Sequence, residues 1–170
     1  MVNNILPIFN GLLHVLMITI LLCLSISDYR TFKIPSWTTA CIGILGLIYM
    51  SLNPVSRMNG VFGFFSVSIL LGLIYLLTKG RGIGGGDVKL MAVSGLMLGW
   101  RKNILAFFVG CVLVSFVYLF RRKFLEKQFG LSDSFHRLAF GPYLAAGIVV
   151  SMLWGEKIIS AYVSWPGLMF

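Results

Sequence analysis

Charged residues are scarce in this chain of 170 residues: they make up 11% of it, and only five are acidic. A soluble domain usually carries about a quarter charged residues. Because 58% of the residues are hydrophobic and the mean hydropathy is +0.94, the apolar surface is too large to be enclosed in a soluble core of this size. The composition therefore excludes an ordinary soluble domain and predicts a protein embedded in lipid.

Motifs for metal-dependent or serine chemistry are missing as well. No HExxH sequence is present, and none of the three cysteines, Cys23, Cys41 and Cys111, belongs to a CxxC pair. Together with the two histidines, these cysteines have no spacing that would build a zinc site, so we expect no metal and no cofactor. We interpret the cysteines as small buried apolar residues. Ala92 stands where a GxSG motif around Ser94 would need glycine, which argues against a serine protease.

No basic residue precedes the first apolar run, which extends from Ile5 to Ile26. A cleavable secretory signal has a basic region, a short apolar run and a small-residue cleavage site. This run is longer than that, and basic residues follow it at Arg30 and Lys33. We therefore expect a first transmembrane helix that is retained.

Apolar stretches separated by turn and charge signals predict an all-α membrane protein. We expect a polytopic bundle of six transmembrane helices forming one membrane domain over residues 1–170, with the N-terminus outside. The expected helices cover roughly residues 5–27, 36–52, 60–78, 87–100, 103–120 and 138–156. The fourth is shorter than the bilayer core, so it would thin the membrane locally.

Basic residues favour this topology. With six crossings, ten basic residues face the cytoplasm and four face outside, which is the asymmetry that the positive-inside rule requires. The cytoplasmic set is Arg30, Lys33, Lys79, Arg81, Lys89, Arg121, Arg122, Lys123, Lys127 and Arg137, and the outer set is Arg57, Arg101, Lys102 and Lys157. Without a crossing at 87–100 the basic block at 121–137 would move outside. We therefore place the chain in the cell inner membrane. We attribute its net charge of +9 to the positive-inside topology rather than to nucleic-acid binding.

Two of the five acids are candidate catalytic residues. Asp28 ends the first predicted helix and Asp87 begins the fourth, and the topology places both at the cytoplasmic boundary. A carboxylate at that depth is unfavourable unless it is paired, hydrated or functional. Two facing carboxylates share a proton, the arrangement with which aspartyl proteases activate water and polarise a carbonyl. Structural roles stay open, since Asp87 could favour a helix N-terminus and Asp28 could pair with Arg30.

Five glycines lie between Lys79 and Asp87. Glycine lets another backbone approach closely. A plain linker would explain the glycines, but it would not explain an acid placed directly after them at the start of a helix. The pattern indicates a site where an extended substrate strand reaches the Asp87 carboxylate.

Three motifs resemble those of the prepilin peptidases, the leader peptidases of type IV prepilins and preflagellins. Gly84–Asp87 resembles the GxGD motif of membrane aspartyl proteases, and Gly84–Leu90 resembles its prepilin peptidase form. Asp28–Arg30 followed by Ile34–Pro35 resembles the other aspartate motif of the family. Phe140–Tyr143 resembles a third feature, and the three motifs occur in the expected order over most of the chain.

The resemblance implies a membrane aspartyl endopeptidase, without a cofactor, that cuts a pilin-like precursor at the cytoplasmic boundary. It implies that Asp28 and Asp87 are the catalytic pair. The implied active-site loop is Gly84, Gly85 and Gly86, and the implied substrate-positioning residues are Lys89, Phe140, Gly141 and Pro142. Lys89 is equally well explained as an inside-positive anchor, and Pro142 as a helix initiator.

Departures from the family pattern limit what the resemblance implies. Many relatives carry an N-terminal methyltransferase extension with two CxxC pairs, and this sequence has none. We therefore expect peptidase activity without N-methylation, as in the short form associated with tight-adherence (Flp-type) pili or with archaeal preflagellin peptidases. Ala139 and Ser36 stand where relatives often have Pro and Asn.

Two other functions stay open beside the peptidase. One is a small polytopic transporter, in which two boundary carboxylates relay protons. The other is a non-catalytic structural subunit of a pilus or secretion system, although a degenerate relative would typically lack one of the two aspartates.

Overall fold

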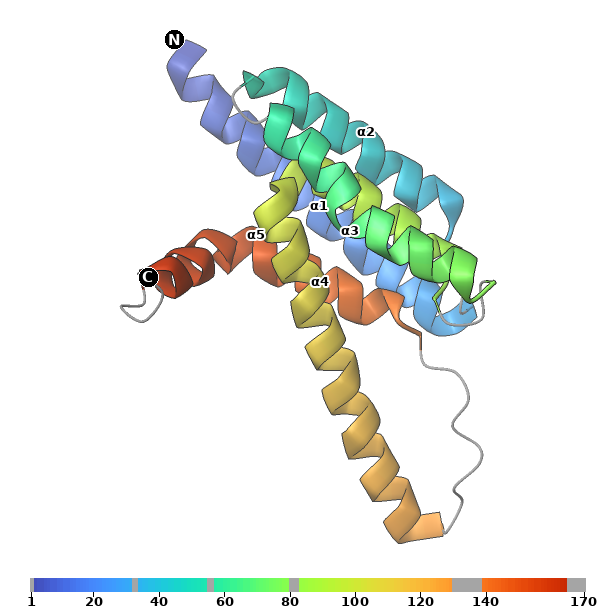
Figure 1. The fold of residues 1–170 in the computed structure, drawn as a ribbon. Helices are drawn as coiled ribbons and strands as arrows, with labels where there is room; N and C mark the ends of the chain where they lie inside the picture. Colours follow the sequence, from blue (N-terminus) through green and yellow to red (C-terminus); the bar gives the residue numbers. More distant parts are fainter. Residues whose placement is uncertain (1, 32–33, 55–56, 80–82, 130–138, 165–170) are drawn as a thin grey trace.

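The computed structural model describes residues 2–31, 34–54, 57–79, 83–129 and 139–164, without the side chains of 2–5 and 122–129 (Figure 1). Within these ranges the chain forms five helices and no strand. The helices are α1 (Val2–Thr31), α2 (Ser36–Leu52), α3 (Arg57–Leu77), α4 (Gly85–Phe129) and α5 (Gly141–Val163). The predicted all-α class is therefore confirmed.

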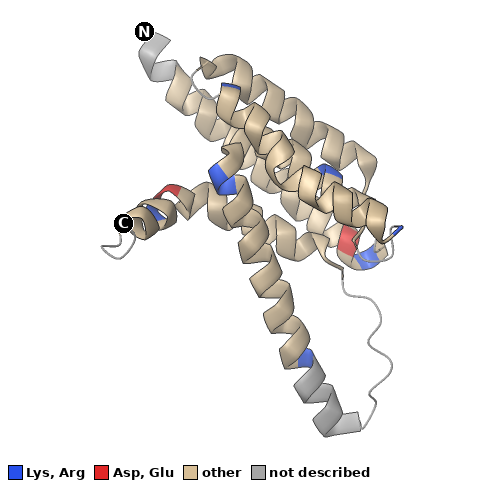
Figure 2. Cartoon of the chain, in the orientation of Figure 1, with Lys and Arg blue, Asp and Glu red and all other residues tan. Residues whose placement is uncertain are grey.

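Four of the helices are long and apolar enough to cross a membrane. They are α1 (over Leu6–Thr31), α3, α4 (over Gly85–Arg121) and α5, whereas α2 is a shorter apolar helix. Charged residues are few along the ribbon and lie mostly near helix ends or at the bend of α4 (Figure 2). Many large apolar side chains point away from the bundle, as expected where lipid is the solvent. The chain is therefore a multi-pass membrane protein.

A bend inside α4 accounts for two of the predicted helices. The stretches expected at 87–100 and 103–120 both lie within α4, which has one non-helical residue, Gly99, with φ 76° and ψ 171°. That conformation is essentially restricted to glycine, so the break falls at Gly99 and not at 101–103 as the sequence indicated. We call residues 85–98 the first arm of α4 and residues 100–129 the second arm.

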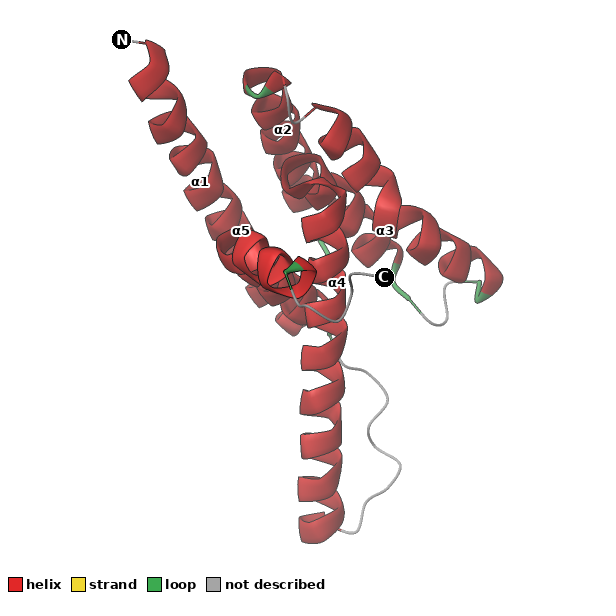
Figure 3. Ribbon diagram, turned by 60° about the vertical axis from the view of Figure 1, so that its left-hand side comes forward, coloured by secondary structure: helices red, strands yellow, loops and turns green. Residues whose placement is uncertain are grey.

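The two arms take different directions. The first arm runs beside α3, and the second arm turns away at the bend and crosses α5 (Figure 1). In a second view the end of the second arm extends beyond the other helices (Figure 3). The bend therefore separates a layer containing α1, α2, α3 and the first arm from the crossing of the second arm with α5.

Small residues allow the helices to approach closely. A Cβ built on Gly63 of α3 would collide with the backbone of Gly95 in α4, and the same is true in reverse. Gly147 of α5 likewise meets the backbone of Ala106. Close contact between small residues is a principal source of helix association in lipid, where no hydrophobic force drives helices together.

The cysteines correct one expectation from the sequence. We interpreted all three as buried, but Cys23 is exposed and Cys41 and Cys111 are half-buried. Their segments are apolar because they face lipid, so an apolar neighbourhood in the sequence did not indicate burial in the protein.

Candidate active site

Asp28 belongs to the buried face of α1. Four nearly unexposed residues repeat along that face at helical spacing: Leu13, Met17, Leu21 and Leu24. Asp28 is the next position in this series, four residues after Leu24, and its side chain is 5% exposed. The repeat that packs α1 onto the bundle therefore also turns the Asp28 carboxylate inward. Residue type alone would not predict this, because acids are rarely buried.

The start of α5 supplies a partner for this carboxylate. Gly141 is the first residue of α5, so its backbone N–H has no acceptor within the helix. It donates to Oδ2 of Asp28 across a distance of 3.0 Å. A Cβ built on Gly141 would lie 2.5 Å from the same oxygen, so the contact requires glycine. The resemblance assigned Gly141 to substrate positioning, and the structure places it on a candidate catalytic carboxylate.

The rest of the Phe140–Tyr143 turn begins the helix. The carbonyl of Phe140 accepts hydrogen bonds from the N–H groups of Tyr143 and Leu144, at 3.1 and 3.2 Å. Phe140 packs against the buried core, and Pro142 occupies the first turn. The expected role of Pro142 as a helix initiator therefore agrees with its position, because its missing N–H needs no acceptor there.

Asp87 lies in the first turn of α4 and is 8% exposed. Its backbone N–H donates to the carbonyl of Gly84 at 3.1 Å. The helix begins at Gly85, so Gly85 and Gly86 belong to the helix and only Gly84 precedes it. The negative side chain is also favoured at a helix N-terminus, so the structural role that the sequence left open operates at Asp87 as well.

The glycines before Asp87 have different neighbours. A Cβ on Gly86 would lie 2.9 Å from the Cβ of Ile34, and one on Gly84 would lie 3.0 Å from Oδ2 of Asp87. A Cβ on Gly85 would make only ordinary contacts, at 3.5 Å or more, with the ring of Tyr75. Gly86 therefore lets the start of α4 pack on Ile34, so that the Ile34–Pro35 motif and the GxGD-like motif touch each other.

The two aspartates come together from distant parts of the sequence. Asp28 lies close enough to Asp87 for their charges to interact. Within the described part of the chain, Asp28 makes no ion pair with Arg30, whose side chain is exposed. Two buried carboxylates whose charges interact are suited to act as a pair, one as acid and the other as base.

Lys89 lies away from this pair. Its exposed side chain borders a groove of about 320 Å³ on another face of α4. The other residues that line the groove come from α2, α3 and α4: Ser36, Thr39, Ala40, Gly43, Phe64, Ala92 and Val93. Lys89 and Asp87 therefore lie on different faces of α4.

Comparison with known proteins identifies the family. Residues 15–119 match the profile described as the type IV leader peptidase family, and this range contains Asp28 and Asp87. The chain belongs to this family. The resemblance to prepilin peptidases is thereby confirmed.

Curated relatives support the assignment. Over 157 residues the chain is 29% identical to a prepilin leader peptidase/N-methyltransferase of Pseudomonas aeruginosa, covering 86% of this chain and 51% of the relative. It is 30% identical to the protein of the same name from Bacillus subtilis, covering 88% of this chain and 58% of the relative. The Aeromonas hydrophila protein of that name is also 30% identical, with 91% and 53% coverage. The chain thus spans about half the length of these relatives. No solved structure matches it.

Proposed function

We propose that this chain is a membrane aspartyl endopeptidase that removes the short basic leader peptide from pilin-like precursors of the type IV or Flp class. The observation that supports this function is that two buried carboxylates, Asp28 and Asp87, lie close enough for their charges to interact, inside the region that matches the family. A lone buried acid could serve packing or capping, whereas two buried acids whose charges interact are the arrangement that functional sites favour.

In the proposed mechanism one ionised carboxylate of the pair takes a proton from a water molecule. The other, protonated carboxylate donates a hydrogen bond to the scissile carbonyl oxygen while the water oxygen attacks the carbonyl carbon. The tetrahedral intermediate then collapses: the C–N bond breaks, and the amine leaves with a proton from the pair. The Gly141 N–H holds Asp28 in place throughout. Gly84 is exposed beside Asp87, so an extended substrate strand can approach that carboxylate closely.

The proposed topology has six crossings, with the N-terminus outside, in the cell inner membrane. The bend at Gly99 supports it, because it lets the two arms of α4 cross in opposite directions. The active site then faces the cytoplasm, where the basic leader of a precursor would lie. The distribution of basic residues argues for the same orientation.

The proposed partner is the precursor itself. Because the cytoplasmic side of the chain is basic, a basic leader gains no attraction from it. We propose that affinity comes from docking the apolar helix of the precursor between transmembrane helices, with Phe140 and Pro142 beside the scissile segment. Lys89 is proposed to contact the substrate from its groove.

The experiment that tests the function is leader removal from a co-expressed pilin-type precursor, followed as a gel shift. Wild type is compared with Asp28→Asn and Asp87→Asn, each checked for membrane insertion. We expect wild type to cleave and both inserted variants to be inactive. Cleavage by either variant would remove that aspartate from the mechanism. A wild type that leaves several precursors uncut would favour a transporter or a structural subunit.

A further inference from the structure

Asn103 is a fully buried amide at the start of the second arm of α4, with 0% of its side chain surface exposed. Its Nδ2 donates to the carbonyl of Gly63 at 2.9 Å and to the carbonyl of Met91 at 3.1 Å. Its Oδ1 accepts from Oγ of Ser94 at 3.2 Å. The side chain of Asn103, a residue of the second arm, therefore bonds both to α3 and to the first arm of α4.

The position of this amide is closely defined. The backbones of Gly63 and Gly95 touch beside it, and a Cβ on Gly95 would lie 2.8 Å from Nδ2 of Asn103. A buried amide is tolerated in an apolar bundle only where its hydrogen bonds are satisfied. Both N–H hydrogens and the carbonyl oxygen of Asn103 have partners, so the amide holds one arrangement of the three segments.

The amide is connected to Asp87 through the first arm. Met91, whose carbonyl Asn103 holds, lies one helical turn after Asp87 on the same buried face. A change in how the first arm sits against α3 would therefore displace the Asp87 carboxylate. Asn103 touches neither aspartate, so any effect on the reaction passes through this helix.

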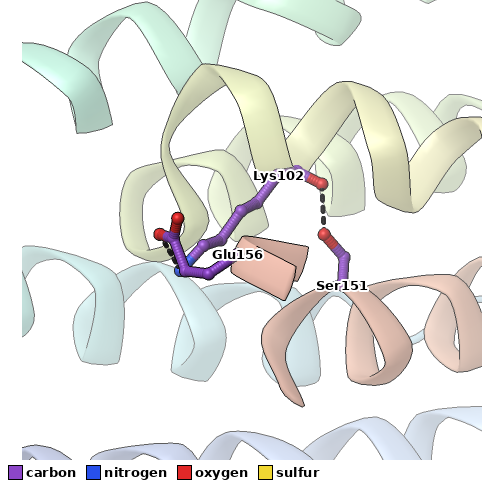
Figure 4. Close-up of polar contacts among 3 residues, drawn as sticks. All are labelled: Lys102, Ser151 and Glu156. Atoms are coloured by element: carbon purple, nitrogen blue, oxygen red, sulfur yellow. Dashed lines mark hydrogen bonds and ion pairs between the residues drawn. The ribbon is translucent and has the colours of Figure 1, made fainter. Parts of the chain in front are cut away.

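The neighbouring residue connects the same turn to Asp28. The backbone carbonyl of Lys102 accepts a hydrogen bond of 2.6 Å from Oγ of Ser151 in α5 (Figure 4). The side chain Nζ of Lys102 forms an ion pair of 2.8 Å with Glu156, also in α5. The other end of α5 begins with Gly141, which holds Asp28. Residues 102 and 103 therefore bind both α5, whose first residue holds Asp28, and the first arm of α4, which carries Asp87.

We propose that Asn103 is a positioning residue: by fixing the first arm of α4 against α3 and the second arm, it sets the separation of Asp87 from Asp28. This inference rests on the proposed function. It explains a polar residue that the sequence analysis did not single out and that contacts no part of the active site.

The test compares purified wild type with Asn103→Ala and Asn103→Ser in a cleavage assay that resolves kcat from KM. The matched control is Ile42→Ala, which removes a buried side chain from α2, a helix that carries neither aspartate. Thermal melting in detergent is measured for all four. Because small displacements of catalytic groups lower the rate steeply, we expect Asn103→Ala to lower kcat about tenfold or more, with KM within about twofold. Asn103→Ser, which keeps one donor, should recover part of the loss.

The control separates positioning from stability. We expect Ile42→Ala to melt at least as early as Asn103→Ala while keeping kcat within about twofold of wild type. If Asn103→Ala keeps the wild-type kcat, or if Ile42→Ala loses as much kcat at equal melting temperature, the positioning role is refuted. A wild type that does not cleave refutes the proposed function, and this inference with it.

Discussion

The backbone N–H of Gly141 donates to Oδ2 of Asp28 at 3.0 Å, joining two residues that lie 113 positions apart. A Cβ on Gly141 would lie 2.5 Å from that oxygen. The start of α5 thus lies on the Asp28 carboxylate, which is at the end of the buried face of α1. This contact gives the Phe140–Tyr143 turn a role in holding a proposed catalytic group.

Replacing Gly141 with Ala should displace Asp28. The added methyl group cannot share space with Oδ2, so either the carboxylate or the start of α5 must move. A displacement of about 1 Å lowers an enzymatic rate about 100-fold, and we expect kcat for precursor cleavage to fall by that order.

The control for this variant is Gly11→Ala, because a Cβ on Gly11 of α1 meets nothing within 4 Å. It should cleave like wild type. Wild-type kcat in an inserted Gly141→Ala variant would show that the hydrogen bond to Asp28 has no part in the reaction.

Gly85 and Gly86 should respond differently to the same substitution. Gly86→Ala would push its Cβ to 2.9 Å from the Cβ of Ile34, while Gly85→Ala would make only ordinary contacts with Tyr75. We expect Gly86→Ala to lower cleavage at least about tenfold, because the start of α4 carries Asp87, and Gly85→Ala to stay within about threefold of wild type.

A double variant identifies the cause. Shortening the neighbour with Ile34→Ala should restore part of the activity of Gly86→Ala, and the coupling between the two changes is read from a double-mutant cycle. Independent effects of the two substitutions would mean that contact between Ile34 and residue 86 does not position Asp87.

The motifs in the sequence indicated the two candidate catalytic acids but not the residues that hold them in place. Asp28 and Asp87 could be selected because few acids occur in an apolar chain, and helical spacing places each on a buried face. The donor for Asp28 lies on another helix, so no local pattern indicated that Gly141 would reach it. Nor did the sequence indicate a structural role for Asn103, because a single amide next to basic residues at a predicted turn is expected to be exposed to solvent.

For the fold as well, the sequence predicted some features correctly and missed others. Apolar runs predicted helices well, because the backbone N–H and C=O groups of each run must form hydrogen bonds within that run in lipid. The break in α4 was placed at residues 101–103 because Arg101 and Lys102 are charged. It occurs at Gly99 because backbone conformation, and not charge, decides where the helix bends. Burial of the cysteines was predicted wrongly because an apolar residue in a membrane faces lipid as readily as protein.

Gly99→Ala should destabilise the bend without a steric clash. A Cβ at this position would lie no closer than 3.5 Å to Asn59, so the effect is confined to the backbone, whose φ of 76° alanine adopts poorly. Such a conformation costs about 1–3 kcal/mol for a residue other than glycine. We expect a lower midpoint of unfolding in detergent, measured against Gly72→Ala, whose Cβ would make an ordinary 3.8 Å contact. Equal midpoints would mean that the strained conformation at residue 99 is not needed.

The six-crossing topology predicts where a reporter that is active only outside the cytoplasm will function. Fusions after Lys79 and after Arg121 should be inactive, and a fusion after Lys102, just beyond the bend, should be active. If α4 crossed the membrane once, the fusion after Arg121 would lie on the opposite side from Lys79 and would be active. Because Asp28 and Asp87 lie at the same end of the bundle as Lys79, an active reporter after Lys79 would place both carboxylates outside, away from the leader they are proposed to remove.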